Sequence, residues 1–122
     1  MDRLFFSLGS LLALVAVGLG AFGAHSLQGT LTPEMADVYE TGVRYQFYHA
    51  LALLGVAFAE TRWSSTLIPI AGWLFVAGIV LFSGSLYVLS LSGIRALGIV
   101  TPIGGLAFLG GWLLLALGAL QG

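Results

Sequence analysis

The residues best suited to chemistry in this sequence lie between its two histidines, His25 and His49. Acids, one arginine and three tyrosines stand between them. Glu40 and Arg44 are four residues apart with the acid first, the favourable order for an ion pair on a helix. The spacing predicts a polar cluster at one membrane face, with His49 about one turn inside the apolar part of its helix. The cluster comprises His25, Asp37, Glu40, Arg44, Tyr45, Tyr48 and His49.

Imidazole and carboxylate groups together can bind a metal ion. Here each histidine is single, without the paired spacing that zinc proteases and metal-binding helix bundles use. The sequence has no cysteine, so thiolate sites are excluded. We predict no metal and no cofactor. Two interpretations of the cluster stay open: a polar cap that satisfies helix ends, and a vestibule for ligand binding or permeation.

A second polar set, Ser83, Tyr87 and Ser90, shares one face of a predicted helix. Serine hydroxyls in membrane helices usually bond to backbone or to a neighbouring helix. We therefore interpret these residues as a deeper polar face rather than as nucleophiles. No catalytic constellation is found, and the sequence predicts a protein that is not an enzyme.

The elements that position these residues are predicted from composition. The chain of 122 residues is 59% hydrophobic and 7% charged, whereas a soluble domain has roughly 25% charged residues. Residues 4–24, 63–94 and 96–122 contain no acid, lysine or arginine. Such stretches predict helices that cross a lipid bilayer, which need about 20 apolar residues each. Four scattered arginines cannot form the basic face that a nucleic-acid partner requires.

We predict one all-α transmembrane domain over residues 1–122, an integral membrane four-helix bundle. Its spans are about 4–24, 44–60, 67–92 and 97–120. The first span is longer than the apolar core of a signal peptide, roughly 7–15 residues. Thr32 and Pro33 are typical of a helix start. Residues 33–43 are amphipathic and acidic, which predicts a short extension, docked on the protein, before the second span.

Small residues predict where helices pack closely. Ala16, Gly20 and Ala24 repeat every four residues and make a smooth strip on the first helix. Further packing positions are Gly84, Gly104 and Gly105. Glycine-rich faces of this kind predict helix association, within the chain or in a homo-oligomer.

The arginines do not predict an orientation in the membrane. Arg3 and Arg62 lie on one predicted side, and Arg44 and Arg95 lie on the other. The positive-inside rule counts such residues on each side. Two against two leaves the orientation open.

Four ordered blocks resemble a known family. They are Gly20-Ala21-Phe22-Gly23-Ala24-His25, Tyr45-Gln46-Phe47-Tyr48-His49-Ala50-Leu51, Leu81-Phe82-Ser83-Gly84-Ser85-Leu86-Tyr87 and Thr101-Pro102-Ile103-Gly104-Gly105. These blocks are similar to those of the domain of unknown function 423 family, related to transmembrane protein 256. The resemblance covers essentially the whole chain. It implies a multi-pass, four-helix protein of the bacterial inner membrane and brings no activity, cofactor or catalytic residue.

Three functional hypotheses follow, of which a membrane enzyme or metal protein using His25 and His49 has the least support from the sequence. The first is a structural or interaction protein that assembles through its glycine-rich helix faces. The alternative is a channel or facilitator for a small solute or ion, with a polar mouth around His25, Arg44, Tyr48 and His49. The channel requires a continuous polar path from that mouth to Ser83 and Tyr87.

Overall fold

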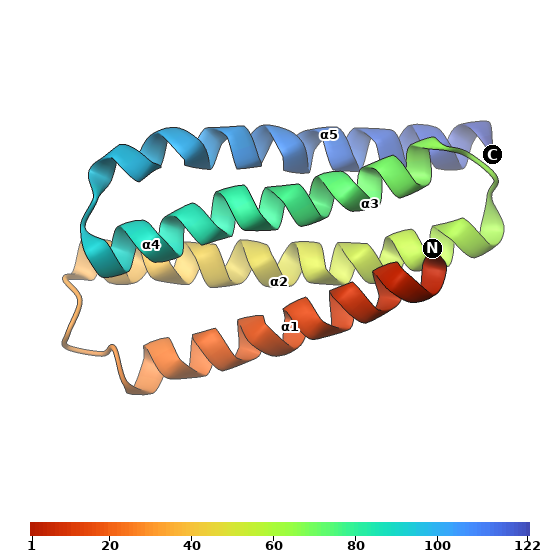
Figure 1. The fold of residues 1–122 in the computed structure, drawn as a ribbon. Coiled ribbons are helices and arrows are strands. Elements are labelled where there is room, and N and C mark those ends of the chain that lie inside the picture. The colour runs from red at the N-terminus through yellow and green to blue at the C-terminus, as the bar shows by residue number, and fades with distance from the viewer.

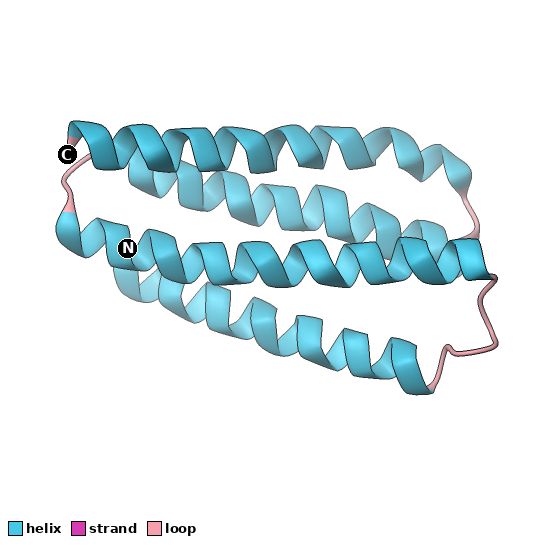
Figure 2. Cartoon of the chain, turned by 180° about the vertical axis from the view of Figure 1, so that it is seen from behind, coloured by secondary structure: helices cyan, strands magenta, loops and turns pink.

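The computed structural model describes residues 1–122 as four long helical rods joined by short connections (Figure 1). The first rod is α1 (Asp2–His25) and the second is α2 (Pro33–Arg62). The third runs through α3 (Leu67–Gly78), a π-helical turn η1 (Ile79–Ser83) and α4 (Gly84–Ser92). The fourth is a 3-10 turn η2 (Arg95–Ile99) followed by α5 (Val100–Gln121). The structure has no strand (Figure 2), which confirms the predicted all-α four-helix bundle.

Consecutive rods run in opposite directions, so the connections alternate between the two ends of the bundle (Figure 1). We call the end with residues 26–32 and 93–99 the loop end. The opposite end, with residues 63–66 and both termini, is the terminal end. The residues predicted to form a polar cluster begin at the loop end.

The second rod begins as the sequence predicts and is the longest single helix, at 30 residues. The Thr32 hydroxyl accepts a hydrogen bond from the Met35 amide at 3.2 Å, and Pro33 occupies the first turn. The helix continues without interruption through Gly42 to Arg62. The amphipathic extension and the second predicted span therefore form one continuous helix.

Three helical segments are long and apolar enough to cross a membrane: Asp2–His25, Leu67–Ser92 and Arg95–Gln121. The second rod does not meet that test, because its first half carries acids and an arginine. The lipid-facing surface of the bundle is apolar, and Leu120, for example, is 82% exposed. Such a surface suits hydrocarbon, where backbone groups must be satisfied within helices.

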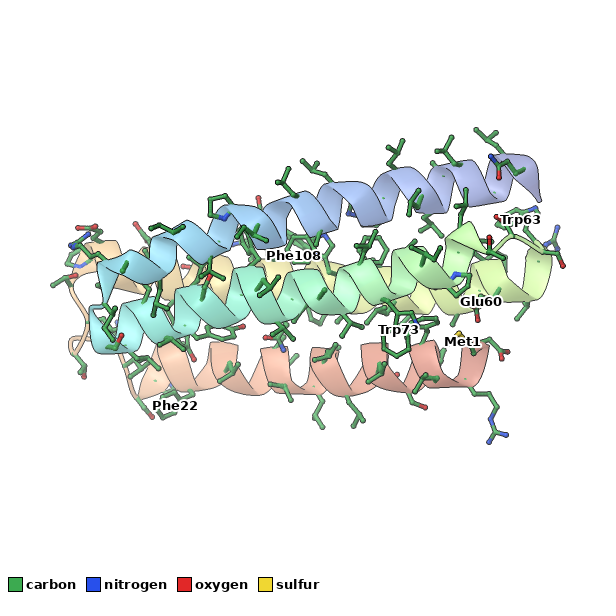
Figure 3. The ribbon with its side chains drawn as sticks, turned by 45° about the horizontal axis from the view of Figure 1, so that its top comes forward. Met1, Phe22, Glu60, Trp63, Trp73 and Phe108 are labelled. Carbon is green, nitrogen blue, oxygen red and sulfur yellow. The ribbon has the colours of Figure 1, made fainter.

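The core is built from rings and branched side chains on all four rods, including Phe5, Leu53, Ile68, Phe75 and Phe108. Figure 3 shows Phe108 pointing between the rods and Phe22 pointing away from them. Glycines let these rings approach the neighbouring backbone. A Cβ at Gly78 would collide with the Phe108 ring, and one at Gly72 would collide with the Phe5 ring.

The predicted packing residues divide into two groups. Ala16 is buried, Gly20 lies against Val43, and Gly104 lies directly on the backbone of Phe82. A Cβ at Gly105 would make an ordinary contact with the Phe82 side chain, 3.9 Å away. Ala24 is exposed and a Cβ at Gly84 would meet nothing. Other close-packed glycines were not named as packing positions from the sequence: Gly9, Gly23, Gly42, Gly72, Gly78, Gly111, Gly118 and Gly122.

Candidate functional site

The structure distributes the predicted polar cluster over different surfaces. His25 ends α1 and is exposed at the loop end. On α2, Asp37, Glu40, Arg44 and Tyr48 are exposed, whereas His49 is buried. The cluster is therefore not one vestibule, because helical spacing turns His49 to the opposite face of α2 from Arg44.

His49 lies in the aromatic interior between α2, α3 and α5. Its ring stacks on Phe108 with centroids 3.5 Å apart and is 5.6 Å from the ring of Phe75. These partners sit in the middle of their rods, so His49 lies at mid-length of the bundle and much deeper than the sequence suggested. The reason is that α2 already starts at Pro33, four helical turns before His49.

The hydrogen bonds of His49 define its tautomer. Its Nδ1 is 2.7 Å from the Tyr45 carbonyl oxygen, which can only accept, so Nδ1 carries the hydrogen. Its Nε2 accepts a hydrogen bond from Trp112 Nε1 at 3.1 Å. Both ring nitrogens of a neutral imidazole are thereby used. The residue connects α2 to α5 and has no nitrogen left for a ligand.

The two cluster tyrosines belong to an aromatic surface beside His49. The Tyr45 ring lies 4.8 Å from Phe82 and 5.5 Å from Tyr48. The Tyr48 side chain is exposed. These rings cover the approach to His49 from the side.

The deeper polar face is used inside the bundle. The Tyr87 hydroxyl donates to Gln46 Oε1 at 2.6 Å, and Gln46 Nε2 donates to the Leu12 carbonyl at 2.8 Å. The Ser90 hydroxyl donates to the Tyr87 carbonyl at 3.0 Å, while the buried Ser83 hydroxyl in the π-helical turn has no partner. The chain from Tyr87 through Gln46 thus joins three rods.

Sequence reasoning missed Gln46 as a member of this polar chain. Its signal was a lone amide on the buried face of a membrane helix, in helical register with Tyr39 and Gly42. It also missed Ser85, whose hydroxyl is 2.6 Å from that of Thr101 and links α4 to α5. Nothing in the sequence pairs residues across rods, so neither partner could be named.

A groove separates α1 from α2 near the loop end, where the two helices diverge (Figure 1). Its volume is about 920 Å³. Small residues of α1 form one wall, including Gly20, Ala21 and Ala24, and the 26–32 connection closes the end with Leu27 and Gln28. The α2 wall is formed by Ala36, Tyr39, Glu40, Val43, Arg44 and Phe47.

An ion pair lies on the α2 side of this groove. Arg44 Nη2 is 2.8 Å from Glu40 Oε1, and the two side chains are 52% and 64% exposed. Two hydrogen bonds to α1 bracket the pair along the bundle. Tyr39 donates to the Leu19 carbonyl at 2.5 Å and Gln46 donates to that of Leu12. Val43, next to Arg44, lies against Gly20, so the pair is level with the loop-end third of α1.

A second ion pair stands apart from the groove. Arg95 Nη1 in η2 is 3.1 Å from Glu34 Oε1 at the start of α2. Both side chains are more than half exposed. This pair joins the two connections of the loop end, whereas the Glu40–Arg44 pair lies along the side of the bundle.

The comparison with known proteins identifies the family. The sequence pattern described as "Protein of unknown function (DUF423)" matches residues 19–105. The chain belongs to this family. The DUF423 match includes all of α2, the 26–32 connection and the α1 lining of the groove from Gly20 onward.

Relatives of this DUF423 protein are bacterial membrane proteins. It is 49% identical to the "UPF0382 membrane protein YwdK" of Bacillus subtilis over 120 residues, 98% of each chain. It is 50% identical to a UPF0382 membrane protein of Staphylococcus haemolyticus over 115 residues, 93% of this chain and 92% of the relative. No solved structure matches. These names and the three apolar segments place the protein in the bacterial inner membrane as a multi-pass protein without an assigned activity.

Proposed function

We propose that all four rods cross the bilayer, α2 included. The path of the chain supports this: α1 ends at the loop end and α3 begins at the terminal end. The chain must return along the bundle between them, and α2 is the segment that does so. Its 30 residues extend about 45 Å at 1.5 Å per residue, more than the hydrocarbon thickness of about 30 Å.

We further propose that the protein binds an amphiphilic lipid in the groove between α1 and α2. The observation that carries this proposal is the Glu40–Arg44 pair, exposed on the side of the bundle along the loop-end third of α1. Charged side chains at membrane depth usually face a bundle interior or a polar partner. A lipid whose headgroup reaches the pair supplies that partner, and its apolar part matches Val17, Val43 and Phe47.

The interior of the bundle offers less support for the channel hypothesis. Its proposed mouth is divided between the outside of α2 and the buried His49. Tyr87 hydrogen-bonds to Gln46, and aromatic rings surround His49. The Tyr87 and Gln46 side chains are used in contacts between rods, and the relatives carry no enzyme name. We therefore propose a binding role without catalysis.

Self-association through the glycine-rich faces also loses part of its support. Ala16, Gly20 and Gly104 are occupied by contacts within the chain. A homo-oligomer would need another surface, and the exposed face of α2 beside the groove is the polar one. Oligomeric state is therefore read in the same experiment as lipid binding.

The test is native mass spectrometry of the protein released from nanodiscs. Ala21→Phe fills the groove from an exposed position on α1. Gly18→Phe is the matched control, because a Cβ there meets nothing within 4 Å. We expect the fraction with bound lipid to fall at least about tenfold in Ala21→Phe alone, equivalent to roughly 1.4 kcal/mol. Equal retention by both variants would show that the groove is not the site.

A further inference from the structure

Resting on the proposed lipid site, we propose that the groove selects a phospholipid whose headgroup carries a primary amine, of the phosphoethanolamine type. The phosphate contacts the Arg44 guanidinium and the ammonium contacts the Glu40 carboxylate. The proposal assigns separate tasks to the two members of one ion pair.

The order of the two charges along the groove carries this assignment. Tyr39 and Gln46 bond to Leu19 and Leu12, so α2 runs from the loop end toward mid-bundle between residues 39 and 46. Arg44 is therefore one turn deeper than Glu40, about 6 Å along the helix. In a phospholipid the phosphate lies next to glycerol and the chains, and the amine lies farther out. The deeper Arg44 guanidinium therefore lies at the level of the phosphate, and the outer Glu40 carboxylate lies at the level of the ammonium.

Both side chains retain bonding capacity after pairing with each other. A guanidinium has five N–H donors and a carboxylate has about four acceptor positions. The Glu40–Arg44 pair uses one hydrogen bond at 2.8 Å. Each side chain is about half exposed, so a headgroup can reach the unused donors and acceptors.

The surroundings of Glu40 favour a cation. The last turn of α1, with Gly23 and Ala24, lines the groove at the loop end. A helix carries partial negative charge at its C-terminus. The ammonium thus meets Glu40 from one wall and the carboxyl end of α1 from the other.

The acyl chains have a track beyond Arg44. Toward the terminal end, the exposed side of α2 changes from polar to apolar, with Leu51 and Phe58 exposed. A Cβ at Gly55 would meet nothing within 4 Å, so that stretch is unobstructed. Val17 and Phe47 connect the groove to this surface. Polar and apolar parts of the site follow the order in which a lipid presents them.

Other headgroups match this geometry less well. A phosphoglycerol lipid satisfies Arg44 but brings its negative charge next to Glu40 without a cation. A phosphocholine lipid has the charge but no N–H to donate to the carboxylate. The acids Glu34, Asp37 and Glu40 outnumber Arg44 on this half of α2, which opposes recruitment of anionic lipid.

The experiment measures competition among three lipids with identical chains and phosphoethanolamine, phosphocholine or phosphoglycerol headgroups. Native mass spectrometry reports which one stays bound to the intact protein. We expect wild type to prefer the amine lipid about tenfold over either competitor. Glu40→Gln should abolish that preference while retaining lipid, and Arg44→Gln should weaken binding of all three.

Glu34→Gln is the matched control, because its ion pair with Arg95 lies outside the groove. It should leave the preference unchanged. The exchange Glu40→Arg with Arg44→Glu keeps an ion pair but reverses its order. We expect this double variant to lose the preference for the amine lipid, with an unchanged unfolding temperature.

The outcomes separate this inference from the proposed function. Lipid retained without headgroup preference, or with a preference that survives Glu40→Gln, overturns the inference and leaves the lipid site standing. No retained lipid in wild type overturns both. A lipid-free dimer means that a second copy covers the groove. Displacement by glycerophosphoethanolamine, which has no chains, at the same concentration as the lipid would rule out the acyl part of the site.

Discussion

The pairing of the third and fourth rods differs from that of α1 and α2. Between the third and fourth rods, close contacts at glycines run along the whole length: side chains of Phe108, Phe75 and Ile68 lie against Gly78, Gly111 and Gly118, and the Phe82 backbone lies against Gly104. In the α1–α2 pair, Gly9 lies against the Ala50 backbone in the terminal half, and Tyr39 and Val43 lie against Gly23 and Gly20 toward the loop end. Toward the loop end the pair opens into the groove and is joined by hydrogen bonds from Tyr39 and Gln46. Close packing continues along the whole pair of the third and fourth rods, whereas at the loop end of α1 and α2 two side chains reach glycines and a groove remains beside them.

The largest effect is expected from adding a methyl group at a close-packed glycine. Gly104→Ala places a methyl group on the backbone of Phe82, and overpacking of this kind typically costs about 1–3 kcal/mol. Gly105→Ala is the adjacent control, since its Cβ would lie 3.9 Å from the nearest side-chain atom. It should be neutral or stabilising by up to about 1 kcal/mol, because alanine is the better helix former. Reversible unfolding in mixed micelles measures both. Equal stability of the two variants would mean that the rods are not in close contact at Gly104.

A smaller loss is expected from the polar chain that joins α1 to the bundle. Gln46→Leu leaves the Tyr87 hydroxyl without its acceptor, which costs about 1–3 kcal/mol for a buried group. The double variant Gln46→Leu with Tyr87→Phe removes both partners and should recover part of that loss. The unfolding free energies of the two single variants and the double variant give the coupling. Strict additivity would show that this hydrogen bond does not hold the rods together.

A single neutral hydrogen bond is tested between α2 and α5. Trp112→Phe removes the indole donor to His49 Nε2 and should lower the free energy of unfolding by about 1 kcal/mol. Lipid retention in the groove should not change, because His49 faces the other side of α2. A loss of bound lipid in this variant would connect the aromatic interior to the groove.

The smallest effect is expected at the loop end. Glu34→Gln breaks an exposed ion pair with Arg95, and exposed pairs contribute about 0–1 kcal/mol. We expect a change below about 0.5 kcal/mol, further reduced by salt, in the same unfolding assay. A larger loss would mean that this pair helps to hold the groove closed at its end.

The sequence predicted what depends on local pattern. Apolar length predicted three of the helical rods, Thr32 and Pro33 predicted the start of α2, and the four-residue spacing predicted the Glu40–Arg44 pair. The family resemblance is confirmed. These features follow from residues close to one another along the chain.

Features that depend on contact between rods could not be predicted in the same way. His49 was grouped with Arg44 because they are near in sequence, yet they face different neighbours. Gly78 and Gly111 are close-packed only because the Phe108 and Phe75 rings of the facing rods lie against them. The groove itself exists because α1 diverges from α2, and no residue pattern within one helix encodes the angle between two.

The position of both termini at one end has a consequence for where the lipid would come from. With four crossings, Met1 and Gly122 lie on the same side of the membrane, and the groove opens near the opposite side. The proposed lipid site would therefore open to only one leaflet, the one farther from the termini. Reporter fusions that locate the termini also identify that leaflet, so the orientation left open by the four arginines decides which lipid pool the groove can reach.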